Sequence, residues 1–345
     1  MSYVGRKLQG KHRSGDEIAS SRLHRGDRFR KLFFFAAKLI FSAICFWYVL
    51  RQISISESVR ALEAFDVRWI AFAVLVAMTR IPLLALRLRA IMVELVPKTV
   101  HLTYLAANMV TAFSLLFAQV MPSVVEEAVR AWMLTRFGCE WRAAFTGVIL
   151  DRAAGIAVLF AFAFFILLFP SALTGLSGYH DFIVCVFGVA LILGVITLLL
   201  APRLAPLLEG WRYSYWIGIF ATDAHRVFLG SRSPVILGAA CFINVLTIAV
   251  IWFVGRAQGL ALPPSECAVL FVVMVGVALI PISVGGWGLR ELAVVSLLGA
   301  HGFAPERALL VSVCFGLVVA ISVLPGAIVW LFYPLPRAAA RDAQW

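Results

Sequence analysis

The sequence is poor in charged residues. Asp, Glu, Lys and Arg together make up 14% of the 345 residues, whereas hydrophobic residues make up 62%, and the mean hydropathy is +0.96. About a quarter of the residues of a soluble domain are charged, so this scarcity excludes an ordinary cytosolic enzyme. It also excludes a disordered or fibrous chain, except at the ends, because such chains contain few apolar residues. The composition predicts an integral membrane protein.

The sequence also lacks the motifs of metal and nucleotide sites. Its six cysteines include no CxxC pair, and its six histidines include no HExxH or HxH arrangement. No GxGxxG, Walker or GxSxG string is present. These absences leave a metal, haem, iron–sulfur, nucleotide or serine-hydrolase centre without support, so we expect no cofactor.

Long apolar runs are what the sequence does contain. A transmembrane helix needs about 20 predominantly apolar residues, and no connection between the runs is long enough for a soluble catalytic domain. We therefore expect a basic tail over 1–31, one transmembrane domain over 32–333 and a short tail over 334–345, and no enzyme. The runs cover 32–50, 69–86, 102–121, 146–169, 181–201, 235–254, 267–282 and 307–333, with shorter pieces at 128–137 and 287–300.

The positive charge is concentrated at the N-terminus. The first 38 residues contain ten Lys and Arg against three Asp and Glu, a net charge of +7. This is more than half of the net charge of +12 of the whole chain. Next to a span, such a run is typical of a cytoplasmic tail that lies against anionic headgroups, and a nucleic-acid arm is the less favoured alternative. The basic run and the apolar run after it are both too long for a cleavable signal peptide.

The basic connections predict the topology. The positive-inside rule places both termini and the connections 87–99, 136–145 and 202–234 in the cytoplasm. By parity, 102–137 must leave from and return to the cytoplasmic side, and 267–300 must do so on the opposite side. Each stretch is either two full spans or a re-entrant hairpin, and the short second arms favour hairpins. We predict an all-α polytopic protein of a bacterial inner membrane, with about six full spans and two oppositely oriented hairpins.

The two hairpin turns resemble each other in sequence. Each has an apolar segment, a Pro, a Ser within two residues, a Val and then an Arg, at equivalent places in units of opposite orientation. This similarity predicts an inverted-topology repeat. The matched residues are Pro122, Ser123, Val124 and Arg130 in the first turn, and Pro281, Ser283, Val284 and Arg290 in the second.

These turns contain charges at membrane depth. A Pro breaks the helix, and glycines loosen the backbone, so polar backbone groups become free where only protein or a wet cavity can cover them. We expect Arg130 and Arg290 to contact a lipid phosphate from opposite sides. The alternative is structural, with Arg130 paired to Glu126 or Glu127 one helical turn away and Arg290 paired to Glu291. The other candidate headgroup contacts are Ser123, Ser283, Gly285, Gly286 and Gly288, and the candidate charge-tuning residues are Glu126, Glu127, Asp151, Arg152 and Glu291.

Further polar residues lie within the apolar runs. Asp151 and Arg152 either line the same cavity or mark a helix interface. Arg80, close to Pro82, is expected to be a cavity residue of a kinked helix, whereas Arg87 and Arg89 are expected to be snorkelling anchors at the cytoplasmic face. Asn108, Gln119 and Asn244 are the remaining polar residues at this depth.

The turn motifs and the string Leu150 to Gly155 resemble the flippase-like family named after the lysylphosphatidylglycerol synthetase transmembrane region. The likeness covers about residues 32 to 333. The second motif is a close match to the family pattern, whereas the first has Glu126 where a Gly is usual. The matching residues are Pro122, Glu127, Arg130, Asp151, Arg152, Pro281, Gly285, Gly286, Gly288, Arg290, Glu291, Pro325 and Gly326.

The resemblance implies movement of a phospholipid or other anionic amphipathic lipid between leaflets. The chain has no room for the soluble aminoacyl-transferring domain of the synthetase, so aminoacylation is not expected. Stand-alone relatives accompany hopanoid, glycolipid and polysaccharide pathways, so a second hypothesis is an accessory or scaffold protein for a lipid-modifying enzyme. An intramembrane enzyme acting on lipid phosphates is disfavoured, because no His–Asp or paired-carboxylate spacing indicates a catalytic centre. The expected partners are membrane lipids, with no nucleic acid.

Overall fold

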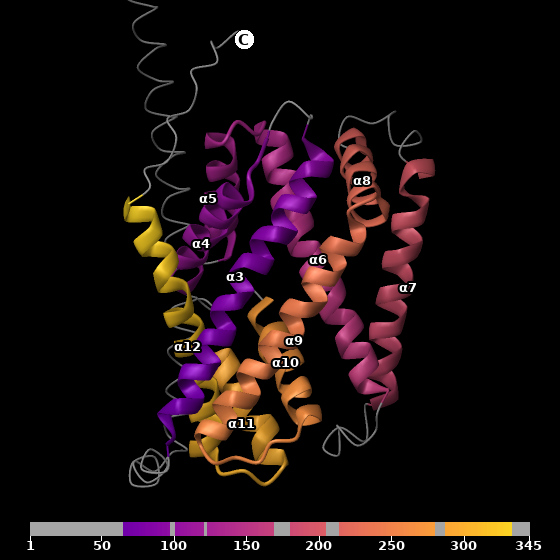
Figure 1. Ribbon diagram of the computed structural model, residues 1–345. Helices are drawn as coiled ribbons and strands as arrows, with labels where there is room; N and C mark the ends of the chain where they lie inside the picture. Colours follow the sequence, from indigo (N-terminus) through magenta and orange to yellow (C-terminus); the bar gives the residue numbers. More distant parts are fainter. Residues whose placement is uncertain are drawn as a thin grey trace, which may run out of the picture.

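The computed structural model describes residues 65–96, 101–120, 123–168, 180–204, 214–279 and 287–332. Within these ranges the chain forms ten α-helices and no strand (Figure 1). The helices are α3 (Val67–Leu95), α4 (Tyr104–Val120), α5 (Ser123–Arg136), α6 (Trp141–Leu167), α7 (His180–Leu204), α8 (Ser214–Leu229), α9 (Ser233–Ala257), α10 (Pro264–Leu279), α11 (Leu289–Ala300) and α12 (Pro305–Phe332).

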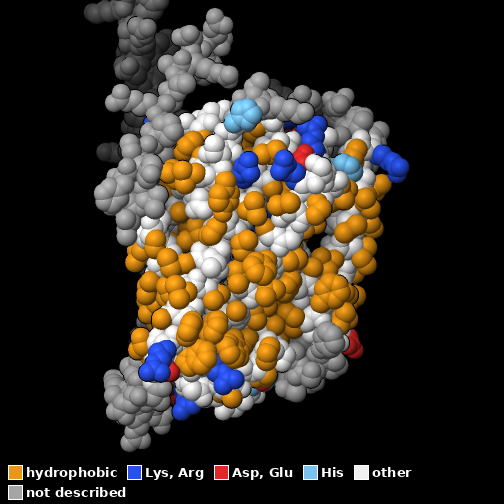
Figure 2. Space-filling model, in the orientation of Figure 1, with side chains coloured by type: hydrophobic (Ala, Val, Ile, Leu, Met, Phe, Trp, Pro, Cys, Tyr) orange, Lys and Arg blue, Asp and Glu red, His pale blue; other side chains and the backbone are white. Residues whose placement is uncertain are grey.

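Five of the described helices, α3, α6, α7, α9 and α12, are long and apolar enough to cross a membrane. They coincide with five of the six predicted complete spans, which confirms a polytopic all-α membrane protein. The predicted span 32–50 and the two tails, 1–31 and 334–345, lie outside the described residues. Figure 2 agrees with this assignment, because hydrophobic side chains cover the middle of the face shown and Lys and Arg gather near its two ends.

Helices α3 and α9 form an antiparallel pair through the middle of the protein. At one end the Asp66 amide donates to the Ala257 carbonyl over 2.8 Å, and at the other end the Ser231 hydroxyl donates to Glu94 Oε1 over 3.1 Å. Ala73 of α3 is fully buried in this interface region. Small residues let two membrane helices approach closely, so van der Waals packing between them replaces packing against lipid.

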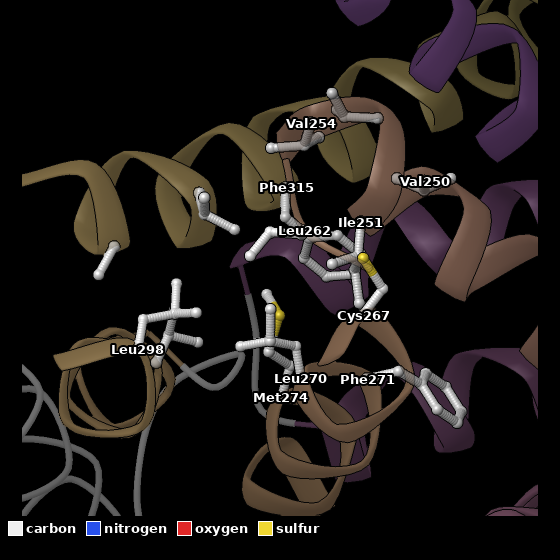
Figure 3. Packing of buried hydrophobic residues seen from close by; sticks show 14 of the residues in the cluster. Val250, Ile251, Val254, Leu262, Cys267, Leu270, Phe271, Met274, Leu298 and Phe315 are labelled. Atoms are coloured by element: carbon white, nitrogen blue, oxygen red, sulfur yellow. The ribbon is translucent and has the colours of Figure 1, made fainter. Parts of the chain in front are cut away.

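The largest apolar cluster joins α9 to α10, α11 and α12 (Figure 3). Side chains in this part of the chain interdigitate instead of facing lipid. They hold α10 and α11 against the antiparallel pair of α3 and α9. The buried residues labelled there are Val250, Ile251, Val254, Leu262, Cys267, Leu270, Phe271, Met274, Leu298 and Phe315.

The two predicted hairpin stretches each form two short helices. α4 has 17 residues and α5 has 14, while α10 has 16 and α11 has 12. At 1.5 Å per residue, each is shorter than a hydrocarbon layer of about 30 Å. Figure 1 shows α4 and α5 at one end of the bundle and α10 and α11 at the opposite end. The connections between the helices of each pair, 121–122 and 280–286, lie outside the described residues.

The predicted cytoplasmic connection 202–234 contains a helix that was not predicted. Helix α8 occupies about half of this stretch, and its Val227 is fully buried against α3, α6 and α9. Phe220, Ala224, Val227 and Phe228 recur at helical spacing and form its apolar face. The stretch did not register as apolar because polar residues, including Asp223, alternate with this face.

Candidate functional site

A polar cavity lies inside the bundle among α3, α4, α5, α6, α9 and α10. Its volume is about 220 Å³, enough for about seven waters at 30 Å³ each. This is below the 300–1,000 Å³ usual for small-molecule sites, so it has room for a headgroup and not for a whole lipid. Its polar lining comprises Arg80, Arg87, Glu126, Glu127, Arg130, Asp151, Arg152, Asn244 and Thr247.

The cavity lies at the middle depth of the long helices. Arg80 is midway along α3 and Asn244 is midway along α9, each about 20 Å from the helix ends at 1.5 Å per residue. Pro82 lies inside α3 two residues after Arg80, and its carbonyl accepts a hydrogen bond from the Tyr104 hydroxyl over 3.0 Å. Charges at this depth are tolerated only where they are paired or wet, so the cavity is a candidate functional site.

Asp151 holds two arginines at the cavity wall. Arg87 donates from Nε to Oδ1 over 2.7 Å and from Nη2 to Oδ2 over 3.0 Å. Arg130 donates from Nη1 to the same Oδ2 over 3.1 Å. The expectation that Arg87 is a snorkelling anchor was therefore wrong: it is a buried residue whose bidentate partner is on another helix. Asp151 thus joins α3, α5 and α6.

Arg130 has two further partners. Its Nη2 donates to Glu126 Oε1 over 2.5 Å, a pair four residues apart on α5, and its Nε donates to Ser114 Oγ over 3.0 Å. All of these groups are buried. Of the two predicted partners of Arg130, the structure selects Glu126.

Glu127 instead pairs with Arg152 of α6, with 2.9 Å between Glu127 Oε1 and Arg152 Nε. These two side chains are 32% and 39% exposed, whereas the Asp151 side chain is 3% exposed. The cavity therefore opens to the outside of the protein beside this ion pair. Because the pair is partly solvated, separating it costs less than separating the Asp151 pairs.

Arg80 remains without a counter-ion among the described residues. Its Nε is buried and has no hydrogen-bond partner, and the same is true of Nδ2 of Asn244. The sequence had placed both residues at membrane depth and Arg80 in a cavity, but neither was predicted to be a site residue. No short motif surrounds them, and their shared level follows only from the pairing of α3 with α9.

Arg290 lies in a separate cluster at the second short helix pair. Its Nη2 donates to Glu291 Oε1 over 2.7 Å, its Nε donates to Ser312 Oγ over 3.1 Å, and its guanidinium stacks on Trp287 at 4.7 Å. Glu291 has an exposure of 0% and also accepts from the Gly288 amide over 2.6 Å. This amide belongs to a glycine with φ 88°, a left-handed conformation that disfavours other residues.

The structure does not bring Arg130 and Arg290 into one cavity. Arg130 lines the polar cavity, and neither Arg290 nor Glu291 is among its lining residues. Among the described residues the two arginines are therefore not placed around one cavity, and Glu291 and Ser312 accept from Nε and Nη2 of Arg290. A phosphate held between the two arginines stays a prediction. Pro122, Pro281, Ser283, Gly285 and Gly286 lie outside the described residues, and so does the side chain of Ser123, where α5 begins.

The sequence comparisons agree with this architecture. A family model described as the lysylphosphatidylglycerol synthase TM region matches residues 35–326, well over half of the chain. No curated protein sequence matches the chain. The matched range contains every described residue that lines the polar cavity.

Proposed function

The chain belongs to the lysylphosphatidylglycerol synthase TM region family, and from that premise we propose that it moves a phospholipid or other anionic amphipathic lipid between the leaflets of a bacterial inner membrane. The observation that carries this proposal is the cavity at mid-depth, lined by seven charged side chains and open beside Glu127 and Arg152. Crossing hydrocarbon is slow for a lipid because its charged headgroup must be desolvated. A wet, charged cavity at the midplane removes most of that barrier.

In this mechanism only the headgroup enters the protein. The cavity of about 220 Å³ suits a headgroup, while the acyl chains remain in the bilayer. The ion pair between Arg152 and Glu127 lies at the opening of the cavity, and the headgroup enters when these two side chains separate. The Arg87–Asp151–Arg130–Glu126 network forms the wall and keeps its charges compensated during passage.

The two short helix pairs provide the moving parts of the proposal. Their position at opposite ends of the bundle (Figure 1) and their matched sequence turns support an inverted repeat of two re-entrant hairpins. The positive-inside rule supports cytoplasmic termini. Opposed hairpins expose a central site alternately to the two leaflets by rocking around it. No nucleotide motif occurs in the sequence, so movement is downhill, coupled to protons through a carboxylate, or dependent on a partner.

Proteoliposomes with a fluorescent phospholipid test this proposal. Quencher added outside reports how fast labelled lipid arrives from the inner leaflet, and the purified chain is expected to accelerate arrival over protein-free vesicles. Gly155 lines the cavity, and a Cβ added there would lie 3.5 Å from Arg87 Nη1. Gly155→Leu therefore fills the cavity and is expected to slow exchange about tenfold.

Gly194→Leu is the matched control. A Cβ at Gly194 of α7 meets nothing within 4 Å, so the same substitution adds the same side chain away from the cavity. It is expected to leave exchange unchanged. An equal loss in both variants, or no acceleration by the unchanged protein, would contradict the proposal.

A further inference from the structure

Arg80 and Asn244 lie at the same level of the antiparallel α3–α9 pair. The pair is joined at Asp66 and Ala257 at one end and at Glu94 and Ser231 at the other. Arg80 is midway between the two contact points on α3, and Asn244 is midway between those on α9. Since antiparallel helices with equal rise keep matched levels along their length, the two side chains enter the cavity at one depth.

Both residues present a buried donor without an acceptor. Arg80 Nε and Asn244 Nδ2 have no hydrogen-bond partner. Thr247, the neighbouring polar residue of the lining, adds no free donor, because its hydroxyl donates to the Ile243 carbonyl over 2.7 Å. A buried donor left unpaired is costly, and an unneutralised guanidinium at mid-membrane is costlier. Two unpaired donors in one cavity therefore call for an acceptor group that the described side chains do not supply.

The charge of the cavity specifies that group further. Its lining contains four arginines and three carboxylates. Each carboxylate is paired with an arginine other than Arg80: Asp151 with Arg87 and Arg130, Glu126 with Arg130, and Glu127 with Arg152. One positive charge remains, and it belongs to Arg80. A ligand with a single negative charge neutralises the cavity, whereas a zwitterionic headgroup brings a cation that no free carboxylate receives.

We propose that Arg80 and Asn244 form the binding site for a singly charged phosphodiester headgroup. One phosphate oxygen accepts from the Arg80 guanidinium and the other accepts from the Asn244 amide, in the manner of charge-assisted recognition. This inference rests on the proposed function for the source of the phosphodiester, which is a membrane lipid. It differs from that function in assigning the substrate class and the residues that select it.

Equilibrium binding to the purified full-length chain in neutral detergent tests the site without requiring transport. The probes are short-chain phosphatidylglycerol, short-chain phosphatidylcholine and inorganic phosphate. The unchanged protein is expected to bind the phosphatidylglycerol at least about tenfold more tightly than the phosphatidylcholine, the ratio that one charged hydrogen bond provides. Excess inorganic phosphate is expected not to displace it, since the acyl chains contribute to binding.

Substitutions assign the preference to residues. Arg80→Gln is expected to abolish the preference for phosphatidylglycerol, Arg80→Lys to retain part of it as a point charge, and Asn244→Ala to weaken binding severalfold. Arg142→Gln is the matched control, because it removes the same charge from a half-exposed residue paired to Asp223 at 3.5 Å. A cooperative thermal unfolding transition of Arg80→Gln would show that the variant is folded.

The outcomes separate this inference from the proposed function. Folded Arg80→Gln that binds phosphatidylglycerol as tightly as the unchanged chain overturns the site, even if leaflet exchange is fast. Displacement by inorganic phosphate at equal concentration overturns the lipid as its ligand. Selective binding that depends on Arg80, with no leaflet exchange in vesicles, supports the site and contradicts the proposed transport.

Discussion

Arg87 of α3 and Asp151 of α6 form a two-pronged ion pair in the middle of the protein, with 2.7 Å between Nε and Oδ1 and 3.0 Å between Nη2 and Oδ2. Both side chains are buried, and Asp151 also accepts from Arg130. The carboxylate is thus the partner of Arg87, and it shares the neutralisation of Arg130 with Glu126. We therefore expect the stability of the cavity wall to depend strongly on this side chain.

Asp151→Ala is expected to destabilise the protein by about 3 kcal/mol or more, since it leaves two buried cations without this partner. The double variant Arg87→Met/Asp151→Leu is expected to regain part of that loss, because Arg130 keeps Glu126. Thermal unfolding in detergent measures both. The exposed Arg142–Asp223 pair is the control, and Arg142→Gln/Asp223→Asn is expected to change stability by less than about 1 kcal/mol. Equal effects of the buried and exposed pairs would contradict the assignment.

Arg290 is expected to act on the fold and not on lipid selection. Arg290→Ala leaves Glu291 as an unpaired buried carboxylate, so we expect a loss of about 3 kcal/mol or more. Arg290→Met/Glu291→Leu removes both charges and is expected to be more stable than the single variant. Per folded molecule, the double variant should retain its preference for phosphatidylglycerol over phosphatidylcholine. Loss of that preference would return Arg290 to the binding site.

Arg80 is expected to reduce stability in the absence of lipid. Arg80→Met removes a guanidinium that no described carboxylate neutralises, so its thermal midpoint in lipid-free detergent should exceed that of the unchanged chain by a few degrees. Added phosphatidylglycerol should raise the midpoint of the unchanged chain, because a ligand at 100 times Kd stabilises the folded state by about 2.7 kcal/mol. It should have little effect on the variant. A lower midpoint for Arg80→Met would show that a protein group already neutralises Arg80.

Cys139 reports on the packing between α5 and α6. This thiol lies in the connection between the two helices, and burial raises its pKa to about 11. The thiolate is the reactive form, and below the pKa its fraction rises tenfold per pH unit. Alkylation of Cys139 is therefore expected to be far slower at pH 7 than that of a free thiol with a pKa of about 8.5, and to accelerate steadily up to pH 10. Mass spectrometry of the labelled peptide measures this, and rapid labelling at pH 7 would show that the connection opens.

The sequence predicted the contacts that depend on local spacing. Glu126 and Arg130 stand four residues apart on one helix, and their pairing follows from that spacing. In the second turn, pairing of Arg290 with Glu291 was the predicted alternative to phosphate binding, and the structure contains this pair. The apolar runs predicted all five spans of the described residues, because a long apolar run is enough to indicate a span.

Contacts between distant helices could not be predicted from one sequence. Arg87 and Asp151 are 64 residues apart, and nothing local shows that α3 and α6 bring them together. The same holds for Arg80 and Asn244, whose common level depends on the antiparallel contact of α3 with α9. Arg290 was assigned to the cavity from repeat symmetry, but Glu291 and Ser312 are close enough to engage it first. Helix α8 was missed because its apolar face is only one side of the helix.

The most direct measurement is the initial rate of leaflet exchange of labelled phosphatidylglycerol and phosphatidylcholine, side by side, in vesicles containing the unchanged chain or Arg80→Gln. We expect the unchanged chain to accelerate exchange of phosphatidylglycerol about tenfold more than that of phosphatidylcholine, and the variant to lose this difference. Exchange of both lipids at the rate of protein-free vesicles would contradict the central claim that this cavity carries a lipid headgroup across the membrane.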